Sequence, residues 1–323
     1  MKSPLLSLPG AVPAEGVDEG VAAHYGDLFR EQRALADGIG FVDLSHRGVV
    51  TVSGEDRLSW LHLLLTQHVS DLPPGQATEA LVLSANGHIE HALYLVDDGS
   101  TVWAHVEPGT STREALLAYL ESMKFFYRVE VADRTDDFAV VHLPAGSIAE
   151  APEGVVVRET PYGRDLFLPR ADLESYAEQY GPAAGLLAYE ALRVEHHRPR
   201  LGFETDHRTI PHELGWIGSA VHLQKGCYRG QETVARVQNL GKPPRRLVFL
   251  HLDGSEVHLP ARGAEIRLAD DGPEGRKIGF ITTSVRHHEL GPVALALVKR
   301  NVPVDARLLA DTTAAAQEVV VEP

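Results

Sequence analysis

The chain has 323 residues, of which 44% are hydrophobic and 23% charged, and its formal net charge is −15 at pH 7. This composition is that of an ordinary globular protein, long enough for two or three packed domains. The negative charge argues against nonspecific electrostatic binding to nucleic acid or to an anionic membrane. No stretch of apolar residues is long enough to span a bilayer. A single cysteine excludes an intramolecular disulfide and a zinc site built on several thiolates. We therefore expect a cytoplasmic protein.

Helices and strands are both predicted along the first 240 residues. Asn86-Gly87 and Asp98-Gly99 supply tight turns, so the strands around them should form an antiparallel meander. Apolar spacing and turn residues predict, in chain order, a helix over Asp27–Asp37, a strand over Gly48–Val52, a helix capped by Ser53, strands over Leu81–Leu83, Ile89–Val96 and Thr101–Val106, a helix through Leu116–Met123, strands over Tyr127–Val131 and Phe138–Leu143, and helices over Ala171–Tyr180 and Gly185–His196.

The pattern changes after Pro243-Pro244, where short apolar runs alternate with turns and no helix signal occurs. Several short strands at this spacing are typical of a small β-barrel. The predicted fold class is therefore α+β, with a body over residues 1–240, made of two lobes at about 1–145 and 150–240, and a C-terminal barrel over 245–323. The predicted barrel strands are Arg246–Leu252, Ala264–Leu268, Lys277–Ser284, Val293–Val298, Ala306–Leu309 and Glu318–Val321.

The only cysteine lies in the segment Lys225-Gly226-Cys227-Tyr228-Arg229-Gly230-Gln231-Glu232. A thiol reacts as its thiolate, which the flanking cations Lys225 and Arg229 favour, and glycines at both sides let backbone N–H groups approach. A lone cysteine is more often an inert, buried hydrophobe, but such a residue usually lies in an apolar run. We therefore predict that Cys227 is a reactive residue and that Lys225 assists it.

The neighbours of the cysteine have functional and structural interpretations. Tyr228 could donate a hydrogen bond, and Gln231 and Glu232 could fix the loop. Tyr228 could equally be a packing residue, and Glu232 could only pair with a nearby arginine at the surface, which contributes little.

Charge is distributed unevenly along the chain. Between Arg193 and Arg246 there are ten cations and five carboxylates, so this window is +5 and the rest of the chain is −20. Such a window is either a solvated basic face or a patch for an anionic small molecule. Both interpretations stay open at this point.

Several common chemistries lack their motifs. The chain contains no P-loop, no dinucleotide-binding glycine motif and no nucleophile elbow. His88 and His91 fall in a predicted strand at odd separation, so their side chains should point to opposite faces and should not share a metal ion. We predict no metal site, and nothing local supports a Cys/His hydrolase.

The segment Lys225–Glu232 resembles the signature of the YgfZ-type folate-binding proteins. These are relatives of the glycine cleavage T-protein, an aminomethyltransferase, and they are linked to iron–sulfur cluster assembly or repair. Phe41–Ser45 and Val52–Asp56 are similar to the N-terminal opening of T-protein-like chains. The central folate domain of these chains is resembled by Leu192–Glu195, Pro199–Glu204 and Ile210–Glu213, and their C-terminal barrel by Ile278–Ser284 and Val293–Val298.

The resemblance implies a T-protein-like fold that binds tetrahydrofolate in a central channel. A pterin needs a carboxylate to pair with its ring N–H groups, and a glutamate tail needs cations. Asp206 and Glu213 would supply the first, and Arg245 and Arg246 the second. The implied partners are iron–sulfur proteins or their assembly machinery, with no direct contact to nucleic acid or membrane.

One difference bears on the choice between relatives. After the Asn86-Gly87 turn the aminomethyltransferases have paired aspartates, one of them catalytic, whereas this chain has Glu90 and His91. Together with the cysteine segment, this favours an accessory factor for iron–sulfur proteins. The alternative is a folate-dependent aminomethyltransferase, or other one-carbon transferase, that uses Glu90. A folate-regulated partner of RNA modification is a third, weaker hypothesis.

Overall fold

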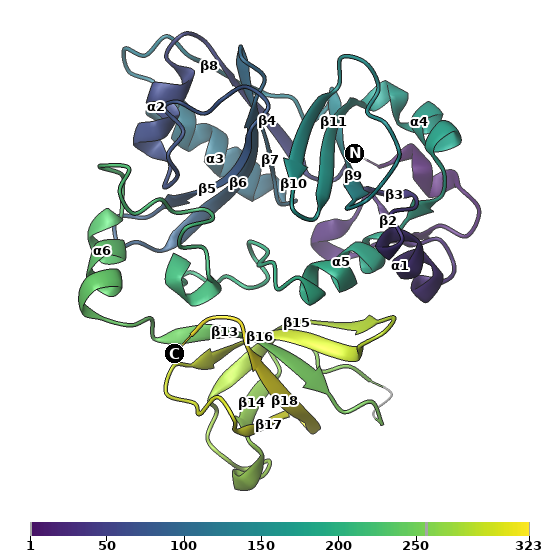
Figure 1. Cartoon of the computed structure of the whole chain (residues 1–323), viewed down its shortest axis with the longest axis vertical. Helices are drawn as coiled ribbons and strands as arrows, with labels where there is room; N and C mark the ends of the chain where they lie inside the picture. The colour runs from purple at the N-terminus through teal and green to yellow at the C-terminus, as the bar shows by residue number, and fades with distance from the viewer. Residues whose placement is uncertain (1, 256–257, 323) are drawn as a thin grey trace. The chain divides into compact units, whose positions relative to one another are not determined.

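A computed structural model describes residues 2–255 and 258–322 of the chain (Figure 1). The chain divides into two compact units. The first unit comprises the N-terminal residues up to Val82, residues His91–Tyr189 and residues Lys225–Tyr228; the second comprises Leu83–Glu90, Glu190–Gln224 and the chain from Arg229 onward. Within the described part, no helix is both long and apolar enough to cross a bilayer.

One sheet of the first unit has five strands in the order β5-β6-β7-β4-β8. Two helices, α2 (Arg57–Leu64) and α3 (Thr110–Ser122), supply Trp60, Leu61, Leu116 and Leu120 to the same apolar core as the sheet. The predicted meander is confirmed, and β6 and β7 pair antiparallel. The strands are β4 (Gly48–Ser53), β5 (Ala77–Leu83), β6 (Ile89–Asp97), β7 (Thr101–Val106) and β8 (Glu130–Asp133).

A second sheet has the order β10-β11-β9-β3-β12, antiparallel except where β12 joins β3. Leu5, Phe41, Val141, Leu166 and Tyr176 form its apolar core. Its strands are β3 (Phe41–Asp43), β9 (Phe138–Pro144), β10 (Val156–Thr160), β11 (Gly163–Pro169) and β12 (Ala183–Ala184), and the chain around them includes β1 (Val12–Pro13), β2 (Ala22–His24), α1 (Leu28–Ala36), α4 (Leu173–Tyr180) and α5 (Leu186–Glu195).

The start of α2 differs from the sequence prediction. Ser53 does not cap this helix, because it is the last residue of β4 and the helix begins only at Arg57. The N-cap is Asp56, whose carboxylate accepts hydrogen bonds from the Arg128 main chain (2.8 Å) and guanidinium (3.1 Å). The strand predicted from Tyr127 begins three residues later, at Glu130, after the residue that makes this contact.

A buried carboxylate joins the two sheets of the first unit. Asp165 of β11 accepts hydrogen bonds from His142 of β9 (2.8 Å), His105 of β7 (3.1 Å) and Arg158 of β10 (2.8 Å). All four side chains are less than one-tenth exposed. Buried charges are costly unless they are paired and hydrogen-bonded, and here each oxygen has a partner.

The hydrogen bonds around His105 define its protonation. A guanidinium N–H of Arg47 lies 3.4 Å from Nδ1 of His105, so Nδ1 is the acceptor and Nε2 carries the proton donated to Asp165. Burial lowers the pKa of His105 to about 4, although Asp165 opposes this shift. Burial alone would raise the pKa of Asp165, but the hydrogen bonds from His105 and His142 hold it well below its usual range.

The second unit contains a closed barrel of six strands in the order β13-β16-β15-β14-β17-β18. Alternate residues such as Val248 and Leu250 face its apolar core. The α+β class with a C-terminal barrel is therefore confirmed. The barrel strands are β13 (Arg245–Leu252), β14 (Glu265–Leu268), β15 (Gly279–His287), β16 (Gly291–Lys299), β17 (Arg307–Ala310) and β18 (Thr313–Val319), and the first five match predicted strands. The sixth prediction is displaced: β18 begins five residues before the predicted Glu318–Val321 and shares only Glu318 and Val319 with it.

The state of His105 predicts a pH dependence of stability. An unfolded histidine binds a proton near pH 6.5, whereas folded His105 stays neutral down to about pH 4. Between these values the unfolded state binds more protons, so the free energy of unfolding should fall by up to roughly 3 kcal/mol as the pH drops from 6.5 to 4. Urea unfolding at pH 7, 5.5 and 4.5 would measure this loss. His105→Gln should show a shallower slope with pH, and an identical slope in the variant would contradict the assignment.

Candidate functional site

The predicted cysteine segment spans the boundary of the two units. Lys225–Tyr228 belongs to the first unit and the residues from Arg229 onward belong to the second.

Lys225 caps a helix in the first unit. Its ammonium donates hydrogen bonds to the main-chain oxygens of His62 and Leu65, at the C-terminal end of α2, with a distance of 2.8 Å to Leu65. These carbonyls lack partners within a helix, and the helix dipole favours a cation there. Burial lowers the pKa of Lys225 to about 8, while neighbouring Cys227 opposes this shift. Lys225 is thus mostly charged at neutral pH, and its ammonium stabilises the C-terminal end of α2.

His62 holds the same segment from the other side. Its Nδ1 accepts the N–H of Val69 at 3.3 Å, so Nε2 carries the proton and donates to the main-chain oxygen of Lys225 at 3.0 Å. Burial and the nearby ammonium lower the pKa of His62, which agrees with a neutral ring.

Cys227 is exposed, between two anchored neighbours. Tyr228 is buried, its ring centre lies 5.0 Å from the Lys225 ammonium, and burial raises its pKa to about 12. The interpretation of Cys227 as a buried packing residue is therefore wrong. Its reactivity stays a prediction, since what the structure shows is a thiol presented by a fixed loop.

The second half of the segment packs on the hairpin between β5 and β6, within the second unit. Gly230 has φ of 85° and precedes α6 (Gln231–Leu240). A Cβ at Gly230 would lie 2.6 Å from the Ser84 oxygen and 3.0 Å from the Gly87 Cα, which no side chain can satisfy. The hairpin tip and the start of α6 are therefore in direct backbone contact.

The same packing brings Arg229 and Glu90 together, with 2.9 Å between guanidinium nitrogen and carboxylate oxygen. Both side chains are about 40% exposed. Glu232 lies exposed in the first turn of α6, where a carboxylate complements the partial positive charge of the helix N-terminus. Sequence analysis singled out Glu90 and Arg229 separately and did not predict their contact.

Three of the four predicted folate-binding residues form one cluster. Arg245 donates to Glu213 at 2.8 Å and to Asp206 at 2.6 Å. The Glu213 side chain is fully enclosed and also accepts the Ile210 N–H at 3.2 Å, whereas Asp206 is 29% exposed. Burial would raise the pKa of Asp206, but its bonds to Arg245 and to the N–H of Arg208 hold it well below the usual range.

Arg246 lies apart from this cluster. It shares its side of β13 with Val248 of the barrel core, and it is fully buried. One nitrogen donates to the oxygens of Val302 (3.1 Å) and Gln317 (2.9 Å), while Nε and Nη1 have no hydrogen-bond partner among the described residues. Arg246 therefore holds the loop residue Val302 and strand β18 together inside the second unit.

Sequence analysis missed a buried ionic network in the second unit. Arg193 donates to Glu190 (2.8 Å) and Glu204 (3.0 Å), and Glu204 accepts the hydroxyls of Thr282 (2.8 Å) and Thr283 (2.6 Å). This network fixes the segment after α5 to strand β15 of the barrel. The spacing of Glu190 and Arg193 by three residues was the available signal.

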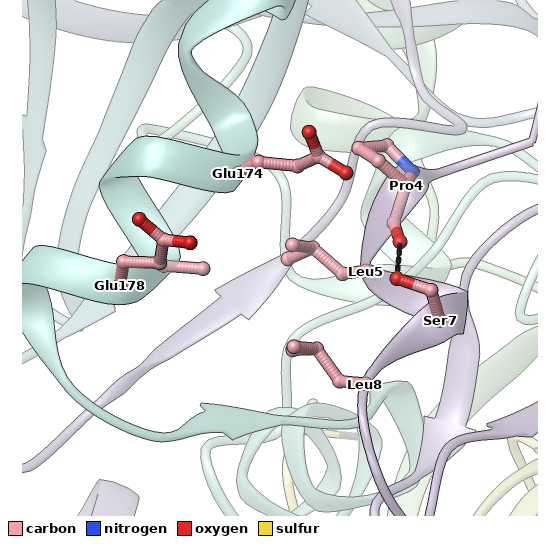
Figure 2. A pocket seen from close by; sticks show the side chains of 7 residues that line it. Pro4, Leu5, Ser7, Leu8, Glu174 and Glu178 are labelled. Carbon is pink, nitrogen blue, oxygen red and sulfur yellow. Dashed lines mark hydrogen bonds between the residues drawn. The ribbon is translucent and has the colours of Figure 1, made fainter.

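Two cavities of the first unit lie away from the predicted site residues. Figure 2 shows one of about 190 Å³, where Leu5 and Leu8 point toward the helix that carries Glu174 and Glu178. Another, of about 600 Å³, lies between α1 and residues 182–184. None of the predicted site residues lines either cavity. Among the described residues, no three His, Cys, Asp or Glu side chains are arranged to hold a metal ion.

The two glycines of the cysteine segment give a matched test of the packing. Both have positive φ, but a Cβ at Gly226 would have no heavy atom within 4 Å. Gly226→Ala should cost about 1–2 kcal/mol from backbone strain alone, and Gly230→Ala should cost at least about 2 kcal/mol more because of the clash with the hairpin. Urea unfolding of both variants measures the difference. Equal losses would mean that the hairpin does not pack on Gly230.

Comparison with known proteins places the chain in context. Residues 22–150 match the family described as the GCVT N-terminal domain. The aminomethyltransferase of Herpetosiphon aurantiacus is 27% identical over 335 residues, which cover 92% of this chain and 90% of that protein. The aminomethyltransferase of Geobacillus kaustophilus is 27% identical over 345 residues, which cover 95% of this chain and 92% of that protein.

A solved structure shares the whole fold. The crystal structure of glycine cleavage system aminomethyltransferase T from Bartonella henselae matches with a TM-score of 0.80 at 21% identity, covering 98% of this chain and 94% of that one. The architecture described above is thus the fold of this aminomethyltransferase. The chain is a T-protein-like relative of the aminomethyltransferases.

Proposed function

We propose that this protein binds tetrahydrofolate and transfers a one-carbon unit, in the manner of an aminomethyltransferase. The supporting observation is similarity over nearly the full length: the matched relatives carry that name and cover 85% or more of this chain. The T-protein-like fold supports the same proposal.

Asp206 is the residue that fits a folate ring best. Reduced pterins present N–H groups, and an ionised carboxylate with exposed oxygens accepts them. Asp206 is partly exposed and kept ionised, whereas Glu213 is enclosed and saturated by Arg245. In this proposal Asp206 binds the pterin, and Glu213 and Arg245 position it. Arg246 is fully buried, so it is not proposed to bind the glutamate tail.

Glu90 is the carboxylate proposed to act near N5 and N10 of the folate. Its carboxylate lies 2.9 Å from the Arg229 guanidinium and is about 40% exposed, so it is accessible to a ligand, as a general base must be. An ion pair this exposed is weak, so Glu90 can exchange Arg229 for another partner at little cost.

A second candidate is an accessory role in assembly or repair of iron–sulfur proteins in the cytoplasm, with the YgfZ-type proteins as the relevant relatives. The observation that favours it is the exposed Cys227 on an anchored loop. A cluster generally takes four protein ligands, so a lone thiolate would contact one only transiently or jointly with another chain.

Folate binding can be tested by anaerobic calorimetric titration with tetrahydrofolate. We expect saturable binding by the wild type and at least tenfold weaker binding by Asp206→Asn, since the amide loses the charge that accepts N–H groups. Asp270→Asn is the control, because Asp270 belongs to an exposed ion pair of the same unit. Equal affinities of the Asp206 variant and the wild type would remove Asp206 from the site.

The two candidate activities predict opposite results for Glu90→Gln and Cys227→Ala. If the protein transfers one-carbon units, the wild type should form methylene-tetrahydrofolate from an aminomethyl donor. The rate of this reaction should fall at least about 100-fold in Glu90→Gln and should be unchanged in Cys227→Ala. The accessory role requires no turnover by the wild type. In that case cells carrying only Cys227→Ala should lose activity of their iron–sulfur enzymes, and cells carrying Glu90→Gln should keep it.

A further inference from the structure

The turn between α3 and β8 presents three consecutive aromatic residues to solvent. Phe126 is fully exposed, Phe125 is 76% exposed and Tyr127 is 38% exposed. We call residues 124–127 the aromatic turn. Single exposed apolar residues are common on protein surfaces, but adjacent exposed aromatic rings mark interaction sites.

The backbone of the aromatic turn is strained. The N–H of Tyr127 donates to the oxygen of Lys124 at 2.9 Å, so Phe125 and Phe126 are the central residues of a β-turn. Phe125 has φ of 41°, a conformation that favours glycine at such positions. A solvent-exposed phenylalanine in this conformation contributes little packing to offset the strain.

Both ends of the aromatic turn are clamped. On the α3 side, the indole N–H of buried Trp60 donates to the oxygen of Met123 at 2.9 Å. On the β8 side, Arg128 donates to Asp56 through its main chain (2.8 Å) and its guanidinium (3.1 Å), and also pairs with Glu55. The rings are therefore displayed by a fixed turn, which lowers the entropy that binding must overcome.

We propose that the aromatic turn is a docking surface for a partner protein with an apolar pocket rimmed by lysine or arginine. Aromatic residues surrounded by charged groups have the anatomy of a protein interface, in which rings fill a pocket and charges lie at the rim. The carboxylates of the rim are Glu55, Asp56 and Glu121, and its cations are Lys124 and Arg128. Carboxylates are in excess, so the complementary rim is basic.

The size of the aromatic turn indicates a transient complex. Three aromatic side chains bury about 150–250 Å² each at most, which is below the roughly 800 Å² per partner of a stable interface. A second copy of this chain would bring the same excess of carboxylates, and an anionic membrane would meet a chain of net charge −15. A basic-rimmed partner protein suits both the area and the charge.

Photo-crosslinking in cells can identify the partner. The full chain is made with benzoylphenylalanine at position 126 or, as the control, at position 148, where Ile148 is 95% exposed in another loop of the same unit. A protein crosslinked from position 126 and not from 148 is purified and titrated with the wild type, with Phe125→Ser/Phe126→Ser and with Ile148→Ser. Thermal unfolding first establishes that both variants are folded.

The expected result is micromolar binding by the wild type and by Ile148→Ser, at least tenfold weaker binding by the double serine variant, and weakening with added salt. The proposal is overturned if position 126 crosslinks nothing beyond what position 148 does, if it crosslinks only a second copy of this chain, or if the purified candidate binds the double variant as well as the wild type. It is also overturned if the wild type, and not the double variant, floats with phosphatidylglycerol vesicles.

Discussion

The close backbone approach at Gly230 is the constraint on which the candidate site of the second unit depends. The Ser84 oxygen and the Gly87 Cα occupy the space that a Cβ at Gly230 would need. Since this contact joins the hairpin tip to the start of α6, it also fixes where Arg229 stands relative to Glu90. A side chain at Gly230 would move the hairpin and the helix apart, and the ion pair would be lost with the packing.

Paired arginines organise the interior of both units. Arg158 meets Asp165 in the first unit, and Arg193 and Arg245 meet Glu204 and Glu213 in the second. A guanidinium donates to two carboxylates from one rigid plane, whereas the donors of a lysine ammonium have no such fixed fork. Some arginines of the basic window that sequence analysis noted around residues 193–246 are therefore neutralised by carboxylates inside the fold. This window is a poor measure of positive charge available to a ligand.

Local patterns predicted what local interactions determine. Five of the six barrel strands followed from alternation and turns, and the Asn86-Gly87 hairpin followed from its turn residues. The β10–β11 hairpin was missed because charged residues such as Arg158 and Asp165 interrupt its apolar pattern, and their burial depends on partners far away in the sequence. Helix α6 was missed because glycine at its N-cap provides no side-chain acceptor to signal a start. For the candidate site, the sequence indicated individual residues such as Glu90 and Arg229. It could not indicate which of them are in contact, because tertiary packing brings them together.

The pairing changes the meaning of the differences from the aminomethyltransferase pattern. Glu90 and the cysteine segment are separate departures in the sequence, yet in the structure Glu90 and Arg229 of that segment form one ion pair. At this exposure the pair adds little stability, so its effect is on position: it orients the Glu90 carboxylate toward Arg229. A transferase would use Glu90 once Arg229 releases it, whereas an accessory factor would use the pair to hold the segment that presents Cys227. The chemistry of the site therefore turns on whether a ligand or Arg229 holds the Glu90 carboxylate.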